Sequence, residues 1–139
     1  MAEEVKTKIV NKVKYYATGK RKTSIARVWL VSGSGKIVIN DQKLEDINCP
    51  SSLKAAITKP LVLTNTKDRY DVKATVVGGG TTGQSDAVMY GIAKVLNNVS
   101  DEYRRILKSE GLLTRDCRIV ERKKYGKKKA RKGTQYRKR

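Results

Sequence analysis

The chain has 139 residues with 32 Lys and Arg against 13 Asp and Glu, so its formal net charge is +19. This length favours one domain with a tail, and the charge points to a polyanionic partner. With no histidine and only Cys49 and Cys117, the chain lacks the ligands of a zinc site and the Ser-His and Cys-His nucleophile pairs. The longest apolar runs, such as 28–31, are too short to span a bilayer, and the start does not resemble a secretory signal.

The first half of the chain predicts an arm and three strands. Residues 1–12 are polar and are interpreted as a flexible N-terminal arm, and 13–17 predict a first strand. Alternating apolar residues, the glycine-rich turn at 32–35 and the return over 36–39 predict a hairpin spanning 24–39. The expected inner face of that hairpin carries Ala26, Val28 and Leu30, and the outer face carries Ile25, Arg27, Trp29 and Val31.

The second half predicts one more strand and three helices. A short helix should open at Pro50 and end at Pro60. Residues 70–77 are rich in β-branched side chains and predict a strand. The predicted sheet therefore has about four strands. A longer helix follows, with Val88, Ile92, Val95, Leu96 and Val99 forming one apolar stripe. The fold class is therefore α+β.

A last helix is predicted from its two ends. Ser100 is a good N-cap, and Asp101 and Glu102 then lie in the first turn, where acidic groups suit the helix dipole. Gly111 should close the helix. The side chains expected to face inward are Tyr103, Ile106 and Leu107.

The segment 78–83 (GGGTTG) satisfies the dinucleotide pattern G-x-G-x-x-G. That fold needs an acidic residue at the end of a second parallel strand, whereas Asp101 begins a helix. A phosphate loop is excluded because Gly83 is followed by Gln84 and Ser85 rather than by Lys and Ser or Thr. Two interpretations remain: a glycine turn for close strand–helix packing, or free N–H groups that bind a phosphate, including one of RNA.

The cluster Lys20, Arg21, Lys22 and Thr23 lies at the predicted junction of two strands. Such a cluster alone is often only a solvated turn. Together with Arg27 on the outer face and the overall charge of +19, it favours a surface that contacts phosphates.

The last 18 residues contain 11 basic residues and no acidic one. Charge repulsion at this density prevents independent folding, so we predict that the segment becomes ordered only on a polyanion. Tyr125 and Tyr136 can stack on bases, and Gly126 and Gly133 allow bends. A solubilising tail, a nuclear-import signal and an acidic-membrane patch are alternatives, but the segment has no Trp, Leu or Ile to anchor it in a membrane. An irregular tail suits folded RNA better than a uniform DNA duplex.

Four motifs in order resemble one family, the ninth protein of the small ribosomal subunit, bacterial type. They are 16–28 (YATGKRKTSIARV), 34–37 (SGKI) with Asn40, 78–80 (GGG) with Gly83-Gln84 and 91–93 (GIA), and 113–116 (LTRD) with 120–126 (VERKKYG). The resemblance implies a fold like the second domain of ribosomal protein five of the same subunit, with a left-handed βαβ crossover, helices on one face of the sheet and a long basic C-terminal extension. It implies no enzymatic activity, no cofactor, no metal and no small-molecule substrate.

The resemblance also implies partners: small-subunit rRNA, the anticodon stem-loop of the peptidyl-site tRNA, and neighbouring proteins of the subunit head, all in the cytoplasmic ribosome. We divide the chain into the arm (1–12), an rRNA-binding body (13–117) and a basic tail (118–139). The expected tRNA contacts are Arg137, Lys138 and Arg139. The expected rRNA contacts are Lys20, Arg21, Lys22, Thr23, Arg27, Arg115, Arg118, Arg122, Lys123, Lys124, Tyr125, Gly126, Lys127, Lys128, Lys129, Arg131, Lys132 and Tyr136.

Two functions from other classes stay open on the residues alone. A nucleoid-type architectural protein would bind plain duplex DNA and folded RNA comparably. A nucleotide-dependent enzyme would use the loop 78–83.

Overall fold

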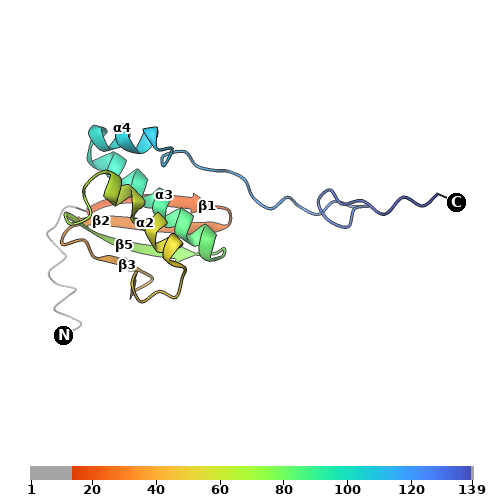
Figure 1. The fold of residues 1–139 in the computed structure, drawn as a ribbon, viewed down its shortest axis with the longest axis horizontal. Coiled ribbons are helices and arrows are strands. Elements are labelled where there is room, and N and C mark those ends of the chain that lie inside the picture. The colour runs from red at the N-terminus through yellow and green to blue at the C-terminus, as the bar shows by residue number, and fades with distance from the viewer. Residues whose placement is uncertain (1–13, 139) are drawn as a thin grey trace.

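The computed structural model describes residues 14–138 (Figure 1), so the predicted arm 1–12 and Arg139 lie outside the described residues. The described part forms five strands and three helices. In chain order they are β1 (Lys14–Arg21), β2 (Ser24–Ser32), β3 (Ile37–Ile39), β4 (Gln42–Lys43), α2 (Ser51–Leu63), β5 (Tyr70–Val77), α3 (Thr81–Val99) and α4 (Asp101–Ser109).

The five strands form one sheet in the order β1-β2-β5-β3-β4. Strands β3 and β5 pair in parallel, and the other neighbours are antiparallel. Helix α3 packs against one face of the sheet, and α2 lies beside α3 on the same side (Figure 1). The α+β class predicted from the sequence is confirmed, and the fifth strand is the two-residue β4, which is too short to leave a periodic signal.

The strand pairing differs from the predicted hairpin over 24–39. The observed hairpin joins β1 to β2 through the turn at Lys22 and Thr23, and β1 runs four residues beyond the predicted end at Ala17. Strand β5 lies between β2 and β3, so these two strands do not pair. The predicted hairpin is therefore wrong, because β2 pairs with β5 instead, from Ile25 to Ser32. Asp71 of β5 also holds the loop after β2 by accepting hydrogen bonds from the backbone N–H groups of Ser34 and Lys36.

The core lies between the sheet and the helices. The alternation predicted for β2 is confirmed, since Ala26, Val28 and Leu30 are fully buried. The predicted stripe of α3 packs on them through Val88, Ile92, Val95 and Leu96. The remaining strands and helices add Ile37, Ile39, Val72, Ala74, Val76, Ile57, Leu61, Leu107 and Leu112.

Two glycines allow β1 and α3 to approach closely. A Cβ added to Gly19 would clash with the Ala87 carbonyl oxygen and lie 2.5 Å from the Gly91 nitrogen. A Cβ added to Gly91 would lie 2.6 Å from a methyl group of Val28. The strand and helix backbones are therefore in direct contact, with no side chain between them.

Helix α2 continues past the predicted end at Pro60 to Leu63. Proline removes one backbone donor and disfavours a helix interior. The last turn forms nevertheless, because Leu61 is fully buried and the backbone N–H of Thr64 donates to the Pro60 carbonyl.

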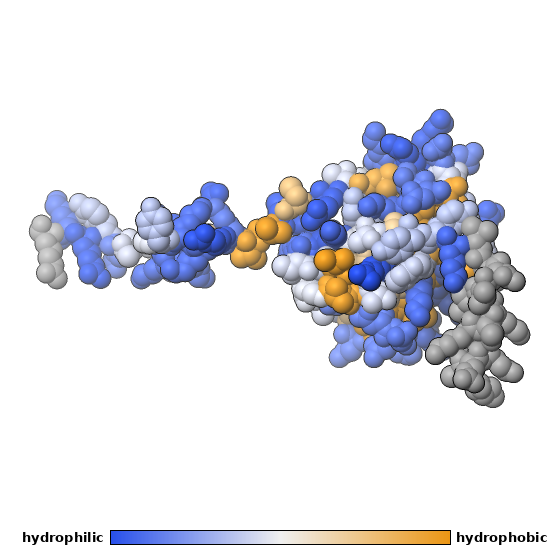
Figure 2. All heavy atoms as spheres, turned by 180° about the vertical axis from the view of Figure 1, so that it is seen from behind, coloured by the Kyte–Doolittle hydropathy of each residue, from blue (hydrophilic) through white to orange (hydrophobic). Residues whose placement is uncertain are grey.

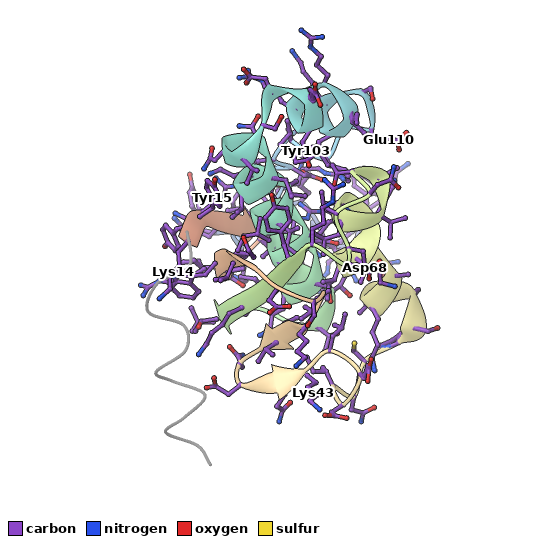
Figure 3. The ribbon with its side chains drawn as sticks, turned by 90° about the vertical axis from the view of Figure 1, so that its left-hand side faces the viewer. Lys14, Tyr15, Lys43, Asp68, Tyr103 and Glu110 are labelled. Atoms are coloured by element: carbon purple, nitrogen blue, oxygen red, sulfur yellow. The ribbon has the colours of Figure 1, made fainter. Side chains whose placement is uncertain are left out.

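Helix α4 has the ends that the sequence predicts. The Ser100 side chain accepts a hydrogen bond from the Glu102 backbone at 3.2 Å. At the other end, Gly111 has φ +70°, and the Leu112 N–H donates to the Leu107 carbonyl in a Schellman arrangement. Leu107 is buried, and Tyr103 of the same helix is half-buried against the core (Figure 3). Ile106 is 40% exposed, so its predicted inward position is wrong.

Candidate nucleic-acid interface

The β1–β2 turn and the glycine loop before α3 form a shallow hollow. Lys22 and Thr23 line it from the turn, and residues 79–83 line it from the loop. Gly78 and Gly79 both have positive φ, +74° and +68°. Two side chains hold the Gly78 carbonyl: the Ser24 hydroxyl donates to it at 3.0 Å, and the Gln84 amide donates at 3.1 Å.

The start of α3 is the electropositive side of this hollow. Gly80 occupies the N-cap position and provides no side-chain cap for the first N–H groups of the helix. Such groups and the helix dipole favour an anion, and Lys22 adds a full positive charge beside them. A dinucleotide fold is excluded, because Asp101 is the first residue of α4 and does not end a parallel strand.

Arg21 leaves the same turn and holds the beginning of the tail. Its guanidinium lies 3.5 Å from the Asp86 carboxylate on α3 and 3.2 Å from the Asp116 carboxylate. It also donates to the backbone carbonyls of Asp116 and Arg118 at 3.3 and 3.4 Å. Arg21 is half-buried. Its contacts therefore fix the point at which the chain leaves the body, and a direct rRNA contact from Arg21 stays a prediction.

Asp116 is the centre of this anchor. Both of its carboxylate oxygens accept hydrogen bonds from the Arg118 guanidinium, the shortest at 2.7 Å, and one accepts the Arg118 backbone N–H at 3.0 Å. These bonds, with the nearby charge of Arg21, hold the pKa of Asp116 well below its usual value. Sequence reasoning missed Asp86 and the role of Asp116, because 95 residues separate Arg21 from Asp116.

The lowered pKa of Asp116 gives a pH prediction. Because the folded pKa lies below the unfolded one, the anchor's contribution is complete above pH about 4 and is lost as the pH falls through the folded value. We expect a carbon-detected NMR titration to place the Asp116 midpoint lower in the native protein than in Arg118→Gln. Arg115→Gln is the control, because Arg115 makes no ion pair with any described residue. Equal midpoints in the native protein and Arg118→Gln would contradict this arrangement.

The face of the sheet away from the helices carries the other predicted body contacts. Arg27 and Lys20 are exposed there. Tyr16 and Trp29 lie beside Arg27 with their ring centroids 5.4 Å apart. Sequence analysis placed Trp29 on this face but assigned it no role.

The basic side chains of the tail are exposed to solvent. Residues 115–138 contain no helix or strand, and Figure 1 shows them running away from the body. Tyr125 is 96% exposed and Tyr136 is 83% exposed. The predicted tail contacts that are exposed are Arg115, Arg118, Arg122, Lys123, Lys124, Gly126, Lys127, Lys128, Lys129, Arg131, Lys132, Arg137 and Lys138.

One acidic side chain organises the middle of the tail. Glu121 pairs with Lys124 at 2.6 Å and with Arg131 at 3.0 Å, and these hydrogen bonds lower its pKa. Gly126 has φ +68° at the turn between them, as expected for a bend at this glycine. The pairs are exposed to solvent, so phosphates can compete with Glu121 for both cations.

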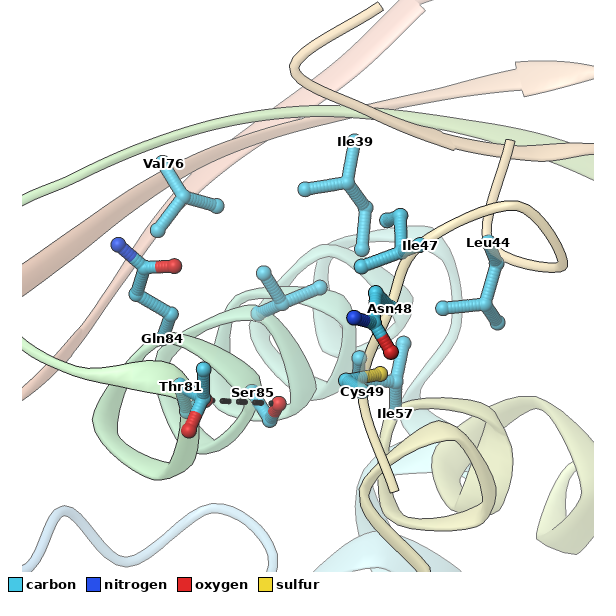
Figure 4. A pocket seen from close by; sticks show the side chains of 11 residues that line it. Ile39, Leu44, Ile47, Asn48, Cys49, Ile57, Val76, Thr81, Gln84 and Ser85 are labelled. Carbon is cyan, nitrogen blue, oxygen red and sulfur yellow. Dashed lines mark hydrogen bonds between the residues drawn. The ribbon is translucent and has the colours of Figure 1, made fainter. Parts of the chain in front are cut away.

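Another concave region is a small pocket between the sheet and the helices (Figure 4). Aliphatic side chains such as Ile39, Ile47 and Ile57 line most of it, and the Ser85 hydroxyl there donates to the Thr81 carbonyl. Cys49 lies in this wall as a free, half-buried thiol. Among the described residues, no cluster of three His, Cys, Asp or Glu side chains could hold a metal ion, and no helix is long and apolar enough to cross a membrane.

A folded α+β body that continues into a long cationic segment is typical of proteins that bind nucleic acid. Comparison of the chain with known proteins identifies its family. Residues 19–139 match the family described as Ribosomal protein S9/S16. The chain is 52% identical over 134 residues to the small ribosomal subunit protein uS9 of Rickettsia felis, which covers 96% of this chain and 83% of that protein. The identity to the protein of the same name from Rickettsia rickettsii is also 52% over 134 residues, covering 84% of that protein.

The chain therefore belongs to the ribosomal protein S9/S16 family, which confirms the resemblance seen in the sequence. Proteins of this family are structural parts of the cytoplasmic ribosome in translation and are not enzymes. The glycine loop 78–83 is therefore not the nucleotide site of an enzyme.

Proposed function

We propose that this protein is a structural component of the small ribosomal subunit, in its head, where the body binds small-subunit rRNA and the tail contacts the peptidyl-site tRNA. The observation that carries the proposal is the exposed cationic tail, whose basic side chains from Arg122 onward pack against no core. Relatives named small ribosomal subunit protein uS9 support the placement in that subunit. Neighbouring ribosomal proteins of the subunit head are further proposed partners.

In this proposal the body and the tail have different roles. Residues 13–117 form the rRNA-binding body, and 118–139 form the tail that RNA orders; the arm 1–12 has no assigned role. The parallel pairing of β3 and β5 around α2 agrees with the βαβ crossover of the proposed fold, that of the second domain of ribosomal protein five. The left-handed sense of the crossover belongs to the same proposal.

The body offers two contact regions for rRNA. The first is the hollow of Lys22, Thr23 and the start of α3, which suits a backbone phosphate. The second is the sheet face with Lys20 and Arg27. Arg21, which lies between these two regions, binds the beginning of the tail. Arg115 and Arg118 are the first of the rRNA contacts that we propose along the tail.

Shortening the tail by Lys138 and Arg139 tests the tRNA contact. We expect the shortened protein to enter subunits at normal stoichiometry, since most tail cations remain. Peptidyl-site tRNA should dissociate about three- to tenfold faster, because two exposed phosphate contacts together contribute about 1 kcal/mol. Filter-binding chases on purified subunits measure this rate.

The matched control removes the same charge from the middle of the tail, as Lys127→Ala with Lys128→Ala. We expect this variant to leave tRNA dissociation unchanged. Loss of the shortened protein from subunits would show instead that the tail end is required for assembly. A competition assay in which duplex DNA binds as well as folded RNA would favour the nucleoid-type alternative.

A further inference from the structure

One face of the sheet is left open by the helices. The register places Tyr16, Trp29 and Lys73 side by side across β1, β2 and β5. The next row on the same face is Thr18, Arg27 and Thr75. Because successive residues on one face of a strand are about 7 Å apart, the two rows form one continuous surface.

The first row presents an aromatic surface. The rings of Tyr16 and Trp29 lie 5.4 Å apart with their planes inclined at 42°. Tyr16 is 48% exposed although it is aromatic, and Trp29 is half-buried. The Tyr16 hydroxyl shares a 2.9 Å hydrogen bond with the Thr18 hydroxyl, so the ring is held in place before any ligand arrives.

Cations surround the aromatic pair. Arg27, Lys14 and Lys20 are exposed, and among residues 14–138 no carboxylate lies within ion-pair distance of Arg27 or Lys20. Lys73 pairs with Asp41 at 3.4 Å, with both side chains in solvent. Asp71, an acidic residue of the neighbouring row, is occupied by two backbone N–H groups of the loop after β2.

We propose that this open face binds an unpaired nucleotide of RNA, with the base stacked on Tyr16 and Trp29 and the phosphate beside Arg27. The proposal rests on the RNA-binding function above and identifies the form of RNA that the body takes. Figure 2 looks onto this face, where pale and hydrophobic side chains lie among hydrophilic ones.

The chemistry selects an unpaired base. In a duplex the base faces are stacked on one another and are not available to a flat protein surface, whereas an unpaired base can stack on an aromatic ring and an arginine. The exposed lysines Lys14, Lys20 and Lys73 argue against a protein partner, because lysine is depleted at protein interfaces.

Trp29 supplies its own probe, because it is the one tryptophan of the sequence. The experiment titrates the full chain with an unstructured RNA oligonucleotide and with the duplex form of the same sequence, at a salt concentration that weakens tail binding. We expect the single strand to quench Trp29 fluorescence and the duplex to leave it nearly unchanged. Quenching by both forms alike would overturn the proposal.

Substitutions separate stacking from charge. Trp29→Leu should weaken binding of the single strand about 5- to 100-fold, as measured by anisotropy of labelled RNA, and Trp29→Phe should restore most of it. Arg27→Gln should weaken binding, whereas Arg104→Gln, on the exposed side of α4, should not. Circular dichroism checks that each variant is folded. Normal affinity in folded Trp29→Leu would overturn the proposal.

The outcomes also separate this inference from the proposed function. RNA binding with normal salt dependence but without quenching of Trp29 would leave the function standing and remove the nucleotide site. A photoreactive benzoylphenylalanine at Thr75, an exposed neighbour of Arg27, tests the occupant inside whole subunits. We expect crosslinks to RNA, and crosslinks to protein instead would overturn the proposal.

Discussion

Removing residues 122–139 is expected to eliminate most of the salt-dependent RNA affinity while leaving the body folded. The deleted segment holds 11 cations. If about eight of them contact phosphates, the slope of log K against log salt should fall by about 6 to 7, at roughly 0.7–0.9 per contact. The thermal midpoint should change little, because among the described residues of the chain no buried core residue lies beyond Leu112.

Anisotropy titrations at several salt concentrations measure this slope for the native and truncated chains. A charge-preserving control, Tyr125→Ala with Tyr136→Ala, should keep the native slope and lower the affinity only by the lost stacking. If the truncated chain kept the native slope, the cations of the tail would not be the RNA-binding groups.

Gly19→Ser, at the buried glycine where β1 contacts α3, is expected to be strongly destabilising. Its Cβ would clash with the Ala87 carbonyl, and the nearest atoms all belong to the backbone of α3, so no flexible side chain can move aside. The strand and α3 must separate, which we expect to lower the free energy of unfolding by about 3 kcal/mol, at the upper end of overpacking effects. That is a large fraction of the roughly 5–15 kcal/mol typical of a domain.

The matched variant is Gly80→Ser. A Cβ there meets no atom within 4 Å, its φ is −103°, and serine is favourable at an N-cap. Urea unfolding should therefore place Gly80→Ser within about 0.5 kcal/mol of the native chain. Similar stabilities for the two variants would show that β1 and α3 are not in backbone contact.

Local signals in the sequence predicted the local features of the fold. The alternation of β2, the stripe of α3 and the two ends of α4 each depend on residues within a few positions of one another. The non-local features were not predictable in this way. Insertion of β5 between β2 and β3 joins segments that are far apart in the sequence, and the Asp71 carboxylate that binds the loop after β2 lies 37 residues from Ser34.

The candidate site shows the same limit. Charge density and the family motifs indicated the tail and the turn at Lys22, since both are visible as runs of residues. The anchor joining Arg21 to Asp86 and Asp116 combines three separate segments, so no spacing rule indicates it. The aromatic pair of Tyr16 and Trp29 depends on the pairing of β1 with β2, which the predicted hairpin over 24–39 did not include.

The most direct test of the whole account is a heteronuclear ¹⁵N NOE measurement on the full chain, free and bound to small-subunit rRNA. We expect amides from Lys123 to Lys138 to give low values in the free protein and values like those of β2 and α3 in the complex. Tail values as high as those of the body before RNA is added would contradict the account.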